Sequence, residues 1–108
     1  MRFFALVLSL CAASCSADTV QDLEARGAAL KAKGDAAGAL EVYRQAAGLD
    51  PQSAHFQDEV GFLLAVLNRR EEAIQSFQRA LDLDPKFAPA QYHLGAAYWL
   101  EKNPGVSI

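Results

Sequence analysis

The sequence predicts an all-α fold, a solenoid of antiparallel helix pairs in which about two and a half copies of one repeat follow an N-terminal signal segment. Three observations predict it. Similar residues recur at a spacing of 34, as at Gly27, Gly61 and Gly95. Alanine, the strongest helix former, occurs 21 times in the 108 residues. Two similar strings end in Asp-Pro, at Pro51 and Pro85, where the residue before proline disfavours a helix.

Residues 1–17 are predicted to be a signal peptide. Arg2 supplies a positive charge, the stretch 3–13 is almost wholly apolar, and small residues follow it. That stretch is too short for a membrane-spanning helix, which needs roughly 20 residues, but it suits a secretory leader. Cleavage after Ala17 and cleavage before Cys15, which resembles a lipidated bacterial cysteine, both stay open. The alternative is a buried N-terminal helix that is never cleaved.

A repeat domain is predicted over residues 18–108, with repeats at 20–53 and 54–87 and a partial repeat at 88–108. In the second repeat, a first helix is expected at about residues 53–67, and Asn68 suits its left-handed end as Gly34 does in the first repeat. A second helix is expected to begin near Arg70 and to end at the Asp-Pro string.

The C-terminal residues are predicted to start one more helix. Asn103 is a good N-terminal cap, and Pro104 is favoured at the first helical position. This pattern favours a fragment or an early-terminated form of a longer repeat protein, and the alternative is a short protein whose last helix closes the fold. Two and a half repeats are few for a solenoid, so we expect self-association through the open C-terminal edge.

The recurring residues resemble the tetratricopeptide repeat (TPR) family. The family pattern has small residues at repeat positions 8, 20 and 27, large ones at 11 and 24, and proline at 32. The first repeat matches it with Gly27, Leu30, Ala39, Tyr43, Ala46 and Pro51, and the second with Gly61, Leu64, Ala73, Phe77, Ala80 and Pro85. The partial repeat matches it with Gly95 and Tyr98, whereas Arg26 departs from the usual leucine. The small residues should let paired helices approach closely.

The resemblance implies a concave groove, lined by the first helix of each repeat, that holds a peptide or a partner helix. The lysine, asparagine and arginine with which chaperone-binding members hold a terminal carboxylate are almost all replaced here, so that activity is not implied. The acidic residues Glu24 and Asp58 indicate a ligand with basic or neutral polar groups beside an apolar stretch. The predicted groove residues are Glu24, Lys31, His55, Asp58, Phe62, Val66, Tyr92 and Trp99.

The sequence contains no pattern typical of catalysis, metal binding or cofactor binding. His55 and His93 lack the further ligands that a metal site needs, and we interpret them as surface or groove residues. The run from Asp82 to Asp84 lacks the glycine and glutamate of a calcium loop. A formal net charge of -3 disfavours nucleic acid as a partner. We therefore predict a protein that is not an enzyme and uses no cofactor.

Two functional hypotheses follow. The first is an interaction scaffold, exported to the periplasm or anchored to the membrane by a lipid on Cys15, that binds a protein or peptide partner during assembly of a bacterial cell-envelope complex. The alternative is an N-terminal regulatory repeat domain of a longer enzyme or of a secretion or assembly protein.

Overall fold

The computed structural model describes residues 19–103 and 105. These residues form five α-helices and no strand: α2 (Val20–Ala32), α3 (Ala36–Leu49), α4 (Ala54–Val66), α5 (Arg70–Leu83) and α6 (Ala88–Lys102). The predicted signal peptide with Cys15, and the C-terminal residues 104 and 106–108, lie outside the described residues. None of these five helices is long and apolar enough to cross a membrane.

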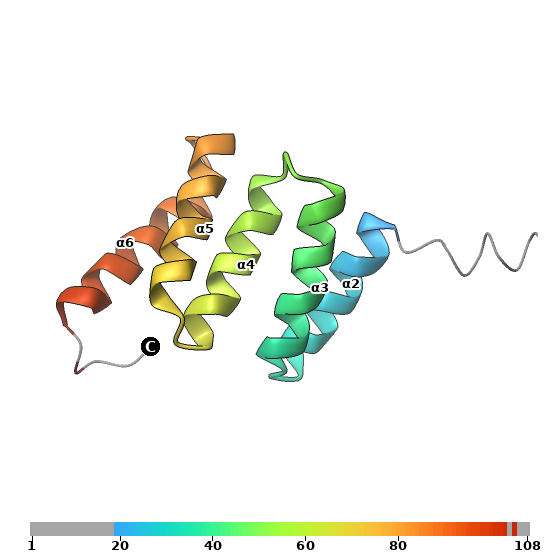
Figure 1. Cartoon of the computed structure of the whole chain (residues 1–108), viewed down its shortest axis with the longest axis horizontal. Coiled ribbons are helices and arrows are strands. Elements are labelled where there is room, and N and C mark those ends of the chain that lie inside the picture. The colour runs from blue at the N-terminus through green and yellow to red at the C-terminus, as the bar shows by residue number, and fades with distance from the viewer. Residues whose placement is uncertain (1–18, 104, 106–108) are drawn as a thin grey trace, which may run out of the picture.

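The five helices form a single row of neighbours. Each helix contacts the next one along the chain, and α4 also contacts α6. Figure 1 shows the resulting order from α2 to α6. No Cα atom of α2 lies within 8 Å of one in α4, so these two helices meet only through side chains. The predicted all-α arrangement of helix pairs is therefore confirmed for the described part of the chain.

In the pairs α2/α3 and α4/α5, an aromatic ring on the second helix packs against a glycine on the first helix. A Cβ atom at Gly27 would lie 2.7 Å from Tyr43 Cε2, and one at Gly61 would lie 2.6 Å from Phe77 Cε1. The exposed fractions of Tyr43 and Phe77 are only 2% and 1%, so neither ring has room to move aside. The recurring glycine is therefore required by the close approach of the helices.

The helix ends follow the sequence signals. The residues after the first helices, Gly34 and Asn68, have φ angles of 84° and 64°, the left-handed conformation predicted for them. Ser53 precedes α4, and its hydroxyl accepts a hydrogen bond of 3.2 Å from the Phe56 N–H. Asp84 ends α5 immediately before a proline, as expected.

The last described helix has one face without a neighbour among the described residues. Gly95 corresponds to Gly27 and Gly61 in the repeat, but no atom lies within 4 Å of the position where its Cβ would stand. The further helix predicted to start at Asn103 and Pro104 falls mostly on residues 104 and 106–108, which lie outside the described residues. Asn103 itself follows the last residue of α6, and its Nδ2 donates a hydrogen bond of 2.8 Å to the Trp99 carbonyl.

We predict that Gly61→Ala destabilises the fold by about 1–3 kcal/mol, because the new methyl group would enter the space that Phe77 fills. Gly95→Ala is the matched control at the equivalent position, where no other described residue interferes within one chain, and in dilute solution it should add about 0.5–1 kcal/mol by removing a glycine from mid-helix. Urea denaturation followed by circular dichroism measures both. Equal effects of the two substitutions would show that ring packing does not require the glycine.

Candidate functional site

Three polar pairs cross between the first helices of successive repeats, α2, α4 and α6. Each pair joins one helix to the next, so the side chains form a continuous surface although α2 and α4 are not in backbone contact. The pairs are Glu24 with His55 at 3.1 Å, Lys31 with Glu59 at 2.6 Å, and Asp58 with His93 at 2.8 Å. Four of the predicted groove residues, Glu24, Lys31, His55 and Asp58, are thus brought together with partners.

Lys31 is held by an anion and by aromatic rings. Its Nζ contacts Glu59 and lies 5.5 Å from the ring centroid of Phe62 and 6.0 Å from that of Tyr43. A cation over a ring is attracted to the negative face of the π system. The Lys31 side chain therefore contacts both an acidic side chain, Glu59, and the aromatic ring of Phe62.

Asp58 is buried beneath His93. Its exposed fraction is 2%, and its Oδ1 accepts a hydrogen bond from His93 Nδ1. Burial raises the pKa of the Asp58 carboxyl, whereas the hydrogen bond and the charge of His93 lower it, and the net pKa shift is upward. Because it is covered, the carboxyl of Asp58 contacts the imidazole ring of His93 and is almost inaccessible to solvent.

His93 lies at the centre of an aromatic cluster. The centroid of its ring is 5.4 Å from those of Phe62 and Phe77, and the Phe77 ring is stacked on it at 29°. Tyr92 meets the same imidazole edge to face, at 5.7 Å and 83°. The ring is thus fixed by aromatic neighbours as well as by the carboxylate of Asp58.

A pocket of about 210 Å³ opens beside this cluster, between α4 and α6. Most of its lining is apolar or aromatic, and the polar groups come from His93 and Arg70. Tyr92, with an exposed fraction of 67%, and Val66, also exposed, form part of its rim. The lining residues are Phe62, Ala65, Val66, Arg70, Phe77, Tyr92, His93, Ala96, Ala97 and Leu100. Such a lining suits an apolar side chain that carries a hydrogen-bond acceptor beside it.

The predicted groove residues divide into two groups in the structure. Phe62, Val66 and Tyr92 line the pocket, whereas Glu24, Lys31 and His55 belong to the polar pairs. Trp99 is 55% exposed and does not line the pocket. Among residues 19–103 and 105, no group of three or more histidine, cysteine, aspartate or glutamate side chains could hold a metal ion.

Sequence reasoning missed the central position of His93 and the contribution of Arg70. The signal for His93 was present, because Asp58 and His93 are 35 residues apart, one repeat plus one residue. This spacing places them at neighbouring positions on successive first helices. Arg70 begins a second helix, whereas the groove was predicted from first helices alone.

Comparison with known proteins supports the repeat assignment. A family model described as TPR repeat matches residues 61–101, and one described as tetratricopeptide repeat matches residues 23–53. The peroxisomal targeting signal receptor of Saccharomyces cerevisiae is 36% identical over 58 residues, which are 54% of this chain and 10% of the receptor. A TPR repeat-containing thioredoxin of Arabidopsis thaliana is 30% identical over 78 residues, 72% of this chain and 11% of the thioredoxin. The match thus spans about a tenth of the length of these relatives.

Solved structures share the fold. The second TPR of Spaghetti (RPAP3), bound to the HSP90 peptide SRMEEVD, has a TM-score of 0.74 at 20% identity, with 80% of each chain covered. The complex of the TPR2AB domain of yeast Sti1 with pHSP90 has a TM-score of 0.76 at 22% identity, covering 94% of this chain and 40% of that one.

The predicted location of the protein is wrong. The relatives come from yeasts and a plant, which have no periplasm of the bacterial kind, and none of those described above is a bacterial envelope protein. The prediction rested on the positive charge of Arg2, on the apolar stretch 3–13 and on the small residues that follow it, and all of these lie outside the described residues. The role in bacterial envelope assembly depended on that location and has no support from these relatives.

We predict that the buried Asp58 carboxyl makes stability depend on pH. Its pKa is raised above the ordinary value of 3.8, so its contribution to stability is fully present below that value and is lost as pH rises through the raised pKa. Asp58→Asn removes this titration but keeps an oxygen that can accept a hydrogen bond from His93. The variant should therefore gain stability relative to the wild type as pH rises.

Urea denaturation of both proteins at several pH values, from about pH 4 to about pH 8, gives the difference in the free energy of unfolding. A variant that instead loses relative stability with rising pH would show that the attraction between Asp58 and His93 outweighs the cost of burial.

Proposed function

Because the chain belongs to the tetratricopeptide repeat family, we propose that the face formed by α2, α4 and α6 binds a peptide segment of a protein partner, and that the protein acts by binding and not by catalysis. The pocket of about 210 Å³ between α4 and α6 carries this proposal. The solved structure of Spaghetti, whose title names a bound HSP90 peptide, supports it by analogy of fold.

The pocket favours an aliphatic or aromatic side chain as the anchor of the peptide. Burying such a side chain contributes about 1.5–3 kcal/mol. Phe62 and Tyr92 offer ring surface to it, and aromatic residues commonly carry much of the binding energy at protein interfaces. The apolar anchor therefore supplies most of the affinity, while the neighbouring polar groups determine which peptide groups are accepted beside it.

The polar lining favours a hydrogen-bond acceptor next to the anchor. Arg70 places a guanidinium group in the pocket, and this group only donates hydrogen bonds. A backbone carbonyl or a carboxylate of the peptide can therefore accept hydrogen bonds from Arg70. The acidic side chains of Glu24 and Asp58 already contact histidines, which reduces their attraction for a basic ligand.

We predict that Tyr92→Ala weakens peptide binding by about 2 kcal/mol, roughly a thirtyfold rise in Kd. Tyr98→Ala is the matched control. It removes the same side chain from the same helix, but Tyr98 is absent from the pocket lining and its hydroxyl accepts a hydrogen bond of 3.0 Å from Gln78 Nε2 on α5.

Peptides selected from a random heptapeptide library on the wild-type protein provide the ligands, and calorimetry gives the Kd of each variant. Equal losses in the two variants, or failure to select any peptide, would contradict the proposed pocket. Thermal melts of both variants show that neither loss reflects unfolding.

We also propose that the open face of α6 associates with a second copy of the chain. A ring from a neighbouring helix packs against Gly27 and against Gly61, whereas no other residue of the described part of the chain comes within 4 Å of the Cβ position at Gly95. Trp99 follows Gly95 by four residues, so it lies on the same side of α6, and it is exposed. Two α6 helices related by a twofold axis would each offer a ring to the glycine of the other.

Sedimentation equilibrium at several concentrations tests this association. We predict a monomer–dimer equilibrium for the wild type and a shift toward monomer of about tenfold or more in Kd for Trp99→Glu, which places a charge in an apolar contact. A wild type that stays monomeric at high concentration would contradict the association.

A further inference from the structure

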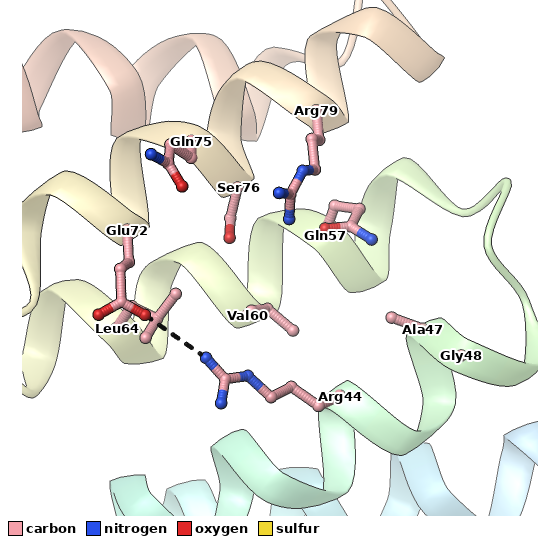
Figure 2. Close-up of a pocket in the computed structure, with 10 residues that line it drawn as sticks. All are labelled: Arg44, Ala47, Gly48, Gln57, Val60, Leu64, Glu72, Gln75, Ser76 and Arg79. Carbon is pink, nitrogen blue, oxygen red and sulfur yellow. Dashed lines mark ion pairs between the residues drawn. The ribbon is translucent and has the colours of Figure 1, made fainter.

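A second groove lies on the face opposite the pocket, between the second helices α3 and α5, with α4 as its floor. Its volume is about 400 Å³. Val60 and Leu64 on α4, both buried, form part of the floor, and they lie roughly half a turn away from Phe62 on the same helix. Figure 2 shows the ten lining residues: Arg44, Ala47, Gly48, Gln57, Val60, Leu64, Glu72, Gln75, Ser76 and Arg79.

Two arginines project into this groove from opposite walls, Arg44 from α3 and Arg79 from α5. No hydrogen bond or ion pair holds the guanidinium group of Arg79 among residues 19–103 and 105. Arg44 Nη2 lies 3.8 Å from Glu72 Oε2, which is long for a charge-assisted hydrogen bond. Both guanidinium groups are therefore available to a further anion.

Glu72 does not cancel this positive charge, because another arginine already holds it. Arg69 Nε and Nη2 donate hydrogen bonds of 2.9 and 2.7 Å to the two carboxylate oxygens of Glu72. This two-bond geometry is the preferred one for an arginine and a carboxylate. Arg44 can thus turn to a ligand without leaving Glu72 unpaired.

The wall opposite Arg79 carries only small side chains near the end of α3. Ala47 and Gly48 line the groove there, and no other described residue lies within 4 Å of the position of a Cβ at Gly48. The amide of Gln57 faces the same space (Figure 2) and can hydrogen-bond a peptide backbone. The groove therefore combines two cations, a neutral hydrogen-bonding group and an apolar floor, with room for an extended chain.

We propose that this groove is a second binding site, which takes an acidic, extended segment of a protein partner. One carboxylate of the segment pairs with Arg79, another pairs with Arg44, and the chain between them lies over Val60 and Leu64. The whole chain has a net charge of -3, so this local positive charge stands out against an acidic background. The site is independent of the peptide pocket between α4 and α6.

A fluorescent ten-residue peptide of alternating glutamate and alanine tests the proposal, with its glutamine–alanine counterpart as the neutral probe. Fluorescence anisotropy should show binding of the acidic peptide alone, weakened by added salt. In an NMR titration, the Gly48 amide should shift and the Gly95 amide, on α6, should not. Equal binding of the two peptides, or shifts confined to Gly95, would overturn the proposal.

Arg79→Gln should weaken binding of the acidic peptide by about tenfold, because a charge-assisted pair is lost. Lys33→Gln is the control: it removes one positive charge from an exposed side chain that lines neither the groove nor the pocket. A larger loss with Lys33→Gln, or equal losses with both, would show that the acidic peptide responds to overall charge and would overturn the assignment.

Discussion

The close approach of paired helices, with a ring pressed against a glycine, is the constraint on which the rest of the structure depends. Because Tyr43 lies against Gly27 and Phe77 against Gly61, each pair has one relative position. That position fixes which residues of α4 face α6 and which face α3 and α5. The pocket beside His93 and the groove beside Arg79 are both consequences of how α4 is held between its neighbours.

The fold could be predicted almost completely from the sequence, because its determinants are local and periodic. Small residues such as Gly61 recur at one spacing, and left-handed ends such as Asn68 require particular residue types. The candidate site could be predicted only in part. Phe62 and Tyr92 follow from repeat register, but the contact between Asp58 and His93 depends on which side chains meet across two helices.

The groove of Arg44 and Arg79 escaped sequence analysis for a different reason. Its cations come from second helices, which the family resemblance does not assign to ligand binding, and their availability depends on Arg69 holding Glu72. The predicted location was wrong because it was inferred from the composition of residues 1–17 alone, which lie outside the described part of the chain. The repeat spacing, which reflects helix packing, predicted the fold correctly, whereas composition alone did not predict the location.

The first two repeats contact each other in two different ways. On one side α3 packs directly against α4, while on the other α2 and α4 are joined by the pairs of Lys31 with Glu59 and Glu24 with His55. Apolar packing requires close shape complementarity, whereas paired polar side chains can shift or exchange partners with water. We therefore expect the spacing between α2 and α4 to vary more readily than the spacing between α3 and α4.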